Sequence, residues 1–350
     1  MKAYVLYDIG DFRLNTVPDP VPGENEVIVA VRAAGICGSD IPRIFKNGTY
    51  TFPLIPGHEF SGVVSSIGKN VDQIWQGKRV GVFPLIPCRT CESCRKKQYE
   101  MCKNYDYLGS RRDGGFAGYV AVPADNLIAL PDQVSFEEAA MLEPMAVAVH
   151  AMRRIQPGKQ DTIAVCGLGT IGLLLLMFLK EAGIENILVI GNKDSQKKIV
   201  HRMGIAEEKY CDYREKDAQA WIMERTNGRG ADVFFECVGR NETVLLAVNN
   251  AAPGGKIMLV GNPYTDMMFD RAVYWKILRN QLTVTGTWNS SFDHNIQDDW
   301  HYVMERLEQN RVNPKELISH RFPFEEMEKG FSIMRDKTED YVKIMGIMEE

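Results

Sequence analysis

The sequence predicts an α/β protein of two domains, in which a partly open barrel of short antiparallel strands accompanies a doubly wound parallel sheet. Three observations lead to this prediction. The chain has 350 residues, which is too long for one ordinary hydrophobic core. Its first third consists of short apolar runs between Pro, Gly, Asn and Asp. From about Asp161 onward, apolar strands alternate with amphipathic helices.

The first domain is expected to take residues 1–150. Residues 88–102 interrupt it with a cysteine-rich excursion, which we expect to form a lobe of its own. Turn-forming residues separate four apolar runs that suit an antiparallel barrel: 26–31, 62–67, 79–84 and 118–122.

The second domain is expected over residues 151–285, and residues 286–350 are expected to return to the first. The segments that follow its first two strands have helical spacing and end near Ala182 and Met203. Strands alternating with helices indicate a parallel sheet covered on both faces. The strands are predicted at 162–166, 186–190, 232–236, 256–260 and 282–285.

Composition and charge exclude several classes of protein. Hydrophobic residues make up 45% and charged residues 25%, as in a globular protein. A net charge of -5 without any basic run argues against a nucleic-acid or membrane partner. The N-terminus lacks the pattern of a signal peptide, and Lys180 stops the longest apolar run well short of a membrane span. We therefore expect a cytoplasmic protein.

Four cysteines crowd into the excursion with the spacing Cys-x2-Cys-x2-Cys-x7-Cys. In a large chain of this type, such a group favours metal-bound thiolates over disulfides. Four thiolates on one short loop can close a tetrahedron around a structural zinc ion, although an iron–sulfur cluster has similar spacing. The ligands would be Cys88, Cys91, Cys94 and Cys102.

Three further segments carry residues that bind metals: Cys37-Gly-Ser39-Asp40, His58-Glu59 and Glu143-Pro144. Each segment is weak evidence by itself, since a lone cysteine is usually packing. Together they supply a thiolate, an imidazole and carboxylates, which is the mixture found in zinc sites that stay open to a substrate.

The order of these motifs resembles the zinc-containing medium-chain dehydrogenases over essentially the full length. That family combines a GroES-like barrel with a Rossmann domain. The segments Cys37-Gly-Ser39-Asp40 and Glu143-Pro144 resemble the corresponding segments of the sorbitol (polyol) dehydrogenase branch of that family. The stretches at 37–48, 109–116 and 276–279 look most similar to galactitol-1-phosphate 5-dehydrogenases.

The resemblance implies a catalytic zinc ion at Cys37, His58 and Glu143. For Glu59 the resemblance implies one of two roles. Glu59 is either a fourth zinc ligand or a carboxylate close to the metal that takes part in catalysis. Ser39 is implied as the group that binds the alcohol and passes on its proton. Many relatives place a histidine five residues after the metal cysteine, where this chain has Pro42, so we expect another route for the proton.

A glycine fingerprint, Gly167-x-Gly169-x2-Gly172, follows the first strand of the second domain and opens a helix. In this context the glycines, with Thr170 and Ile171 between them, predict a site for the pyrophosphate of NAD or NADP.

The choice between the two coenzymes depends on the end of the second strand. NAD-preferring relatives carry an acidic residue there, whereas this chain has Gly191, followed by Asn192 and Lys193. The absence of a carboxylate and the presence of a lysine favour NADP(H). Asp194 remains an alternative ligand for the ribose of NAD.

The predicted reaction is hydride transfer between a polyol phosphate and NAD(P). Asn289 and Ser290 are candidates to read sugar hydroxyls. Four cations are candidates for a phosphate pocket, since arginine can bind a phosphate through two hydrogen bonds: Arg43, Lys46, Arg111 and Arg112.

Two alternatives remain open. One is a dehydrogenase of sorbitol, another free polyol or another secondary alcohol. The other is a non-catalytic dinucleotide-binding protein, since a fold does not guarantee an activity. Relatives are dimers or tetramers, which implies a homo-oligomer.

Overall fold

The computed structural model describes residues 1–348 and divides the chain into two compact units. One unit comprises Met1–Ala146 together with the segment from Ser290 onward, and the other comprises Val147–Asn289. The sequence analysis placed these boundaries at 150 and 285. The predicted fold class, a barrel-like antiparallel domain with a doubly wound parallel domain, is confirmed.

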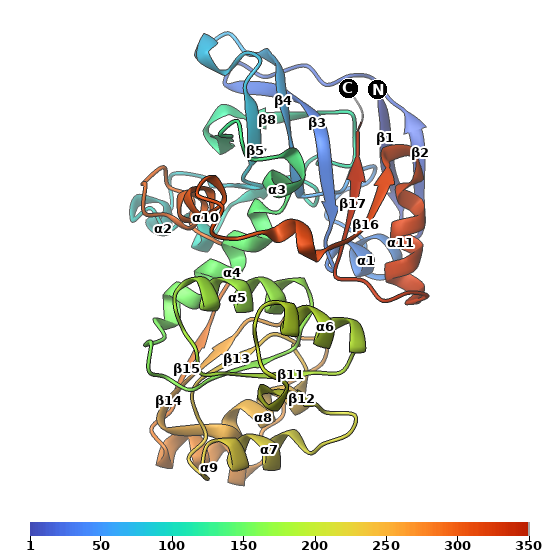
Figure 1. The fold of residues 1–350 in the computed structure, drawn as a ribbon. Coiled ribbons are helices and arrows are strands. Elements are labelled where there is room, and N and C mark those ends of the chain that lie inside the picture. The colour runs from blue at the N-terminus through green and yellow to red at the C-terminus, as the bar shows by residue number, and fades with distance from the viewer. Residues whose placement is uncertain (349–350) are drawn as a thin grey trace. The chain divides into compact units, whose positions relative to one another are not determined.

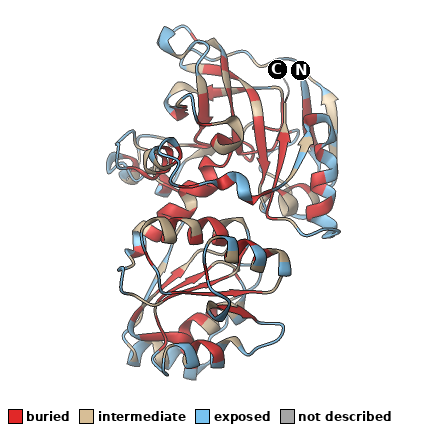
Figure 2. Ribbon diagram, in the orientation of Figure 1, coloured by how far each residue is buried: buried red, intermediate tan, exposed pale blue. Residues whose placement is uncertain are grey.

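The first unit is built on a curved sheet with the strand order β16-β17-β3-β4-β5-β9, in which β8 also pairs with β3 (Figure 1). All its pairings are antiparallel except that of β16 with β17. Apolar side chains of these strands form a buried core, and Figure 2 shows in red the buried parts of the strands. The strands are β3 (Glu26–Ile36), β4 (Glu59–Ile67), β5 (Arg79–Val82), β8 (Tyr119–Pro123), β9 (Leu127–Ala129), β16 (Ile318–Pro323) and β17 (Lys343–Ile347).

Shorter elements surround this sheet. The N-terminal hairpin and the cysteine-rich lobe each contain a two-stranded sheet. The last segment of the chain returns to this unit, because β17 pairs with β3. The elements are β1 (Lys2–Asp8), β2 (Asp11–Thr16), α1 (Asp40–Pro42), β6 (Leu85–Ile86), α2 (Glu92–Arg95), β7 (Asp106–Tyr107), α3 (Phe136–Ala140), α4 (Leu142–Ile155), which continues into the second unit, α10 (Asp299–Glu308) and α11 (Met327–Asp336).

The second unit is a parallel sheet with the order β12-β11-β10-β13-β14-β15. Every residue of β10 and β11 is buried, which is why these strands read as continuous apolar runs. Helices α5 and α6 cover one face, and α7, α8 and α9 cover the other (Figure 1). The elements are β10 (Ile163–Cys166), α5 (Thr170–Glu181), β11 (Ile187–Gly191), α6 (Asp194–Arg202), β12 (Tyr210–Asp212), α7 (Ala218–Arg225), β13 (Ala231–Glu236), α8 (Asn241–Asn250), β14 (Ala251–Leu259), α9 (Arg271–Arg279) and β15 (Thr283–Gly286).

The strand order of this sheet reverses between β10 and β13. Strands β11 and β12 extend it on one side, and β13, β14 and β15 extend it on the other. In doubly wound sheets, ligands bind outside the carboxyl ends of the strands at such a reversal. The glycine fingerprint lies there, directly after β10.

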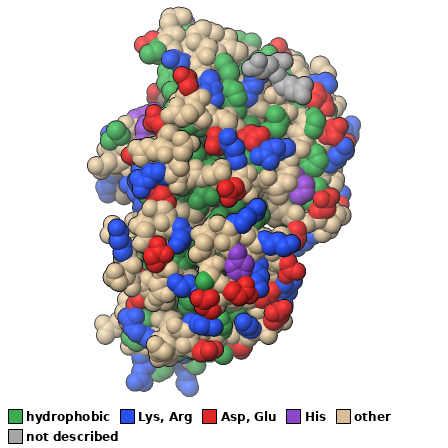
Figure 3. Space-filling view, viewed as in Figure 1, with side chains coloured by type: hydrophobic (Ala, Val, Ile, Leu, Met, Phe, Trp, Pro, Cys, Tyr) green, Lys and Arg blue, Asp and Glu red, His purple; other side chains and the backbone are tan. Residues whose placement is uncertain are grey.

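No helix within residues 1–348 is long and apolar enough to cross a membrane. On the face drawn in Figure 3, basic and acidic side chains are interspersed.

Candidate active site and metal centres

The end of β3 and the start of β4 bring three metal-binding side chains together. Cys37 follows β3, while His58 and Glu59 stand at the start of β4, opposite Gly35 in the antiparallel register. The ligand atoms of Cys37, His58 and Glu59 all lie within 4.8 Å of one another. A Cβ at Gly35 would collide with the Glu59 carboxylate, so this position requires glycine. Because Cys37 is partly exposed and the other two are buried, the arrangement suits a metal site with access for a substrate.

Asp40 is a buried carboxylate that orients two members of this cluster. Its Oδ2 accepts a hydrogen bond from the Cys37 N–H at 3.0 Å, and its Oδ1 lies 3.5 Å from Nδ1 of His58. Burial disfavours the imidazolium, but Asp40 and Cys37 outweigh it and raise the pKa of His58 well above its ordinary value. A carboxylate behind a histidine is a common device for fixing a metal ligand. The sequence showed Asp40 in a segment with residues that bind metals, but not that it orients Cys37 and His58.

Glu143 lies in the first turn of α4, beside the cluster. Tyr107 Oη donates a hydrogen bond to its Oε1 at 3.3 Å. Burial raises the pKa of Glu143 to about 7, with His58 lowering it and Glu59 raising it. Glu143 does not belong to the group whose ligand atoms lie within 4.8 Å. Of the two acidic candidates, Glu59 therefore lies inside the cluster and Glu143 lies next to it.

Lys343 supplies the counter-charge to Glu59. Its Nζ donates to Glu59 Oε2 and also to the carbonyl oxygen of Ile36, at 3.2 Å. The side chains of Lys343 and Glu59 are only 2% and 1% exposed. Burial disfavours the ammonium, but Glu59 and Cys37 outweigh it and raise the pKa of Lys343. This ion pair restrains the carboxylate that faces the metal position.

The donor set fits a zinc ion. A thiol, an imidazole and one carboxylate converge here, with the carboxyl group of Glu143 beside them, and this mixture of sulfur, nitrogen and oxygen is typical of open zinc sites. The charge of a divalent cation would also stabilise the carboxylate form of Glu143 against its burial and against repulsion from Glu59, the two effects that raise its pKa. Cys37, His58 and Glu59 would hold such an ion, and Glu143 beside them would be the alternative acidic ligand.

Ser39 lies directly beside the cluster. Its Oγ donates a hydrogen bond to Cys37 Sγ at 3.3 Å. This hydroxyl therefore lies within hydrogen-bond distance of the first of the three candidate metal ligands. Pro42 ends α1 and offers no group that can carry a proton.

Carboxylates bind two of the four cations that the sequence analysis assigned to a phosphate pocket. Arg43 Nη1 donates to Asp40 Oδ1 at 2.6 Å, and Arg112 Nη2 donates to Glu26 Oε1 at 2.7 Å. Each of these two arginines thus has a structural role, which sequence alone did not indicate. Lys46 is exposed to solvent.

Arg111 is placed differently, between two aromatic rings. Its guanidinium carbon lies 4.2 Å from the centroid of the Tyr50 ring and 4.3 Å from that of Tyr105. The loop that carries it packs against the turn before His58, where a Cβ on Gly109 would meet the carbonyl oxygen of Gly57 at 2.5 Å. The loop that carries Arg111 thus lies against the residue before His58, and the two rings hold the plane of its guanidinium.

The two polar candidates after β15 have structural roles as well. Ser290 is buried, and its Oγ accepts a hydrogen bond from Nε1 of Trp300 at 3.0 Å. Asn289 has a left-handed backbone conformation with φ of 55°. These two residues belong to different compact units.

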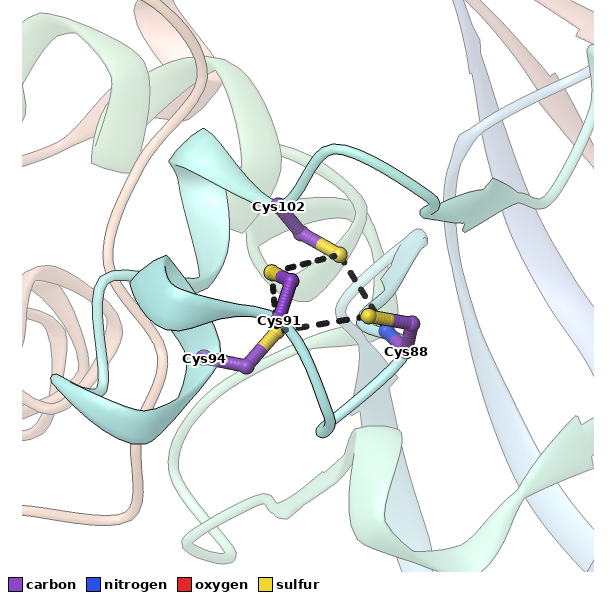
Figure 4. A group of neighbouring side chains, drawn as sticks. All are labelled: Cys88, Cys91, Cys94 and Cys102. Carbon is purple, nitrogen blue, oxygen red and sulfur yellow. Dashed lines mark hydrogen bonds between the residues drawn. The ribbon is translucent and has the colours of Figure 1, made fainter.

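The four cysteines of the lobe converge around one point (Figure 4). Sulfur–sulfur distances are 3.5 Å for Cys91–Cys94, 3.9 Å for Cys91–Cys102 and 4.0 Å for Cys88–Cys94. A sulfur tetrahedron around zinc has edges of about 3.8 Å, given zinc–sulfur bonds of about 2.3 Å. The spacing therefore matches a structural zinc site without rearrangement.

The glycine loop has the backbone geometry of a dinucleotide site. Gly167 has a φ of 98°, and a Cβ on Gly172 would collide with the carbonyl oxygen of Gly167. No atom lies within 4 Å of the position of a Cβ on Gly169, so a ligand can approach the backbone there. Thr170 and Ile171 begin α5, whose N-terminal N–H groups favour an anion.

Gly191 ends β11, where the side chains of Leu168 and Tyr210 occupy the space that a Cβ would need. A Cβ there would meet Leu168 Cδ1 and Tyr210 Oη, both at 2.6 Å. Beyond it, Asn192 donates to Tyr213 Oη at 2.7 Å, and Lys193 precedes α6.

The neighbouring acidic groups are already paired. Arg214 Nη2 donates to Asp194 at 2.6 Å and to Asp212 at 2.5 Å. Asp194, the alternative ribose ligand, therefore has an arginine partner, which the sequence did not indicate.

Comparison with known proteins identifies the family of this chain. A family model for the alcohol dehydrogenase GroES-like domain matches residues 23–132, and one for zinc-binding dehydrogenases matches residues 170–309. Galactitol 1-phosphate 5-dehydrogenase of Escherichia coli (strain K12) is 34% identical over 329 residues, which are 93% of this chain and 94% of the relative. Sorbitol dehydrogenase of Bacillus subtilis (strain 168) is 30% identical over an alignment of 353 positions, which covers 99% of this chain and 96% of the relative.

Solved structures share the complete fold. The crystal structure of galactitol-1-phosphate dehydrogenase from Escherichia coli superposes with a TM-score of 0.92 at 34% identity, covering 99% of this chain and 100% of the other. A zinc-binding dehydrogenase from Sinorhizobium meliloti 1021 bound to NADP gives a TM-score of 0.90 at 26% identity, covering 99% and 98%. With these relatives and this donor set, the chain belongs to the zinc-dependent medium-chain dehydrogenases, among the polyol and alcohol dehydrogenases of that family.

Proposed function

We propose that this protein oxidises the secondary hydroxyl of a polyol phosphate of the galactitol 1-phosphate type to a keto-sugar phosphate, with NADP as hydride acceptor. The observation that carries this proposal is the guanidinium of Arg111, stacked between Tyr50 and Tyr105. The 34% identity to a galactitol 1-phosphate 5-dehydrogenase over nearly the whole chain supports the same substrate class.

Arg111 has the properties of a phosphate ligand. Two tyrosine rings hold its plane, so little side-chain freedom is lost when it binds an anion. Carboxylates neutralise Arg43 and Arg112, whereas the groups that pack on the guanidinium of Arg111 are the neutral rings of Tyr50 and Tyr105. An arginine fork can grip a phosphate through two hydrogen bonds.

The chemistry divides between bound groups and the residues of this chain. Zinc at Cys37, His58 and an acidic partner would lower the pKa of the substrate hydroxyl, and the nicotinamide would accept the hydride. Ser39 Oγ, which lies 3.3 Å from Cys37 Sγ, would accept the proton of the substrate hydroxyl as it passes on its own. Pro42 cannot continue a relay, so the proton leaves Ser39 through water, the coenzyme ribose or Glu143.

The preference for NADP is supported by the end of β11. Position 191 is a glycine, so it carries no acidic side chain to hold the ribose of NAD. Lys193 follows two residues later and can face a 2′-phosphate. A clearly higher kcat/KM with NAD would refute this part of the proposal.

The substrate test compares galactitol 1-phosphate with galactitol. We expect the phosphorylated substrate to have the higher kcat/KM, and R111A to lower that value about 10- to 100-fold, as for loss of a charge-assisted hydrogen bond. The same variant should leave turnover of galactitol within about twofold, since no phosphate is lost. R335A is the matched control, because Arg335 also stacks on an aromatic ring, that of Phe45, at 4.9 Å. Equal efficiency on both substrates would favour free polyols instead, as in the sorbitol dehydrogenase relative.

We also propose that the chain forms a homodimer or homotetramer in the cytoplasm. β15 ends the parallel sheet, and both Val284 on it and a group of large apolar side chains near it are exposed. Unpaired edges and apolar patches of this kind favour association. The exposed neighbours are Tyr264, Met268, Phe269, Tyr274, Trp275, Leu278 and Trp288. The thiols of the cysteine lobe suit a reducing compartment.

A further inference from the structure

Glu236 is a buried carboxylate at the carboxyl edge of the parallel sheet. It ends β13, is 1% exposed, and uses one oxygen, Oε1, to accept three hydrogen bonds. The donors are the N–H groups of Val238 at 2.8 Å and Gly239 at 2.9 Å, and Thr243 Oγ1 at 2.8 Å. Burying a carboxylate is costly unless such donors surround it. Glu236 therefore fixes the turn 237–239 and ties it to the first turn of α8.

This turn packs between the segments that follow β10 and β14, the two strands on either side of β13. On one side, a Cβ at Gly167 would meet Val238 Cγ2 at 2.5 Å, so Val238 lies against the glycine loop. On the other side, Gly239 has a φ of 81°, and a Cβ on it would collide with the carbonyl oxygen of Asn262. The N–H of Tyr264 donates to the Gly239 carbonyl at 3.1 Å. The position of Glu236 thus determines the shape of the sheet edge next to the glycine loop.

The turn lies where a dinucleotide divides into its two halves. The strand order reverses between β10 and β13, and in such sheets the two mononucleotides bind on the two sides of the reversal. The adenosine half faces β10, β11 and Gly191. The nicotinamide half then faces β13 and β14. The turn 237–239 follows β13 directly and is the segment on that side that lies next to the glycine loop.

We propose that Glu236 is a positioning residue for the nicotinamide half of the coenzyme. It acts through the turn 237–239 and touches neither the substrate nor the metal position. The proposal rests on the proposed coenzyme binding and extends it to a residue outside the glycine fingerprint. Because the reacting ring must be held in line with the substrate, a shift of this turn lowers both coenzyme affinity and hydride transfer.

The test compares whole coenzymes with adenosine fragments on the intact, zinc-loaded protein. E236Q keeps the shape of the side chain but removes the charge that strengthens the three hydrogen bonds. We expect the Kd values of NADPH and NADH, measured by tryptophan fluorescence, to rise roughly tenfold. The Kd values of 2′,5′-ADP and AMP should change less than about twofold, because the adenosine side is untouched. The coenzyme KM should rise and kcat should fall.

T226V is the matched control. Thr226 Oγ1 also bonds to backbone groups, Ile222 O at 2.8 Å and Gly230 N at 2.9 Å, but it precedes β13 at the amino end of the sheet. It should leave all four Kd values unchanged. If E236Q fails to fold, T243V removes one of the three donors and should give the same pattern with a smaller loss.

Three outcomes would overturn the inference. Unchanged coenzyme binding in E236Q, or in T243V where E236Q does not fold, would show that the turn needs no carboxylate. An equal loss for coenzymes and fragments would reveal a general structural role. Wild-type protein that binds neither NADPH nor NADH would instead refute the proposed function, and the inference with it.

Discussion

Replacement of Lys343 by methionine tests the ion pair at the centre of the candidate active site. Lys343 and Glu59 are almost completely buried, at 2% and 1% exposure, and Lys343 Nζ also binds the carbonyl oxygen of Ile36. Methionine keeps the length of the side chain but removes its charge. The Glu59 carboxylate then faces Cys37 and Glu143 without a cationic partner from β17.

The magnitude follows from the burial of the pair. Removing one partner of a buried ion pair costs roughly 3–5 kcal/mol of unfolding free energy, because the other charge is left uncompensated. A zinc ion at Cys37, His58 and Glu59 would supply a counter-charge in place of the ammonium. We therefore expect K343M to lose about 3–5 kcal/mol without metal and at least about 1 kcal/mol less with zinc.

The assay is thermal unfolding of wild-type protein and K343M, each with and without zinc. Comparing the four melting temperatures as a cycle cancels the contribution of the cysteine lobe, which is the same in both proteins. The metal-free loss should be on the order of 10 °C for a unit of this size. K69M is the control, since Lys69 and Glu24 form an ion pair that is 67% and 62% exposed, and it should change stability little. If K343M lowers the melting temperature equally with and without zinc, then zinc does not replace the missing charge of Lys343 beside Glu59.

Two further predictions concern other parts of the first unit. C102S removes one thiolate of the lobe, so zinc content measured by atomic spectrometry should fall from about two ions to about one per chain and the melting temperature should fall with it; an unchanged zinc content would contradict the structural site. His301 has its pKa raised by a hydrogen bond to Asp298, so its contribution to stability is present below the unfolded pKa of about 6.5 and is lost as pH rises through the folded value. In the wild type, this pair adds to the free energy of unfolding as the pH falls toward the unfolded pKa, and H301Q should remove that increase. An unaltered pH dependence of urea unfolding in H301Q would contradict a contribution from the pair.

Local spacing explains what could be predicted from the sequence. The ligands of the cysteine lobe lie within residues 88–102, so their convergence needs only one short loop. The glycine fingerprint likewise acts within one strand–turn–helix unit, and continuous apolar runs identified β10 and β11. A three-residue strand such as β12 carries too little pattern to be recognised.

Long-range pairing explains what could not be predicted. Lys343 meets Glu59 because β17 joins β3, and the two residues are 284 positions apart in the chain. Arg112 seemed as suitable for phosphate as Arg111, yet it is bound to Glu26, 86 positions away. A cation in a sequence has no visible partner, and only the fold decides which one it meets.

The most direct test of the catalytic metal site is the zinc content of C37S beside that of the wild type. The account predicts about two zinc ions per chain in the wild type and about one in C37S, with hydride transfer lost and the cysteine lobe retained. A wild-type protein with about one zinc ion per chain, or a C37S variant with the same zinc content as the wild type, would contradict it.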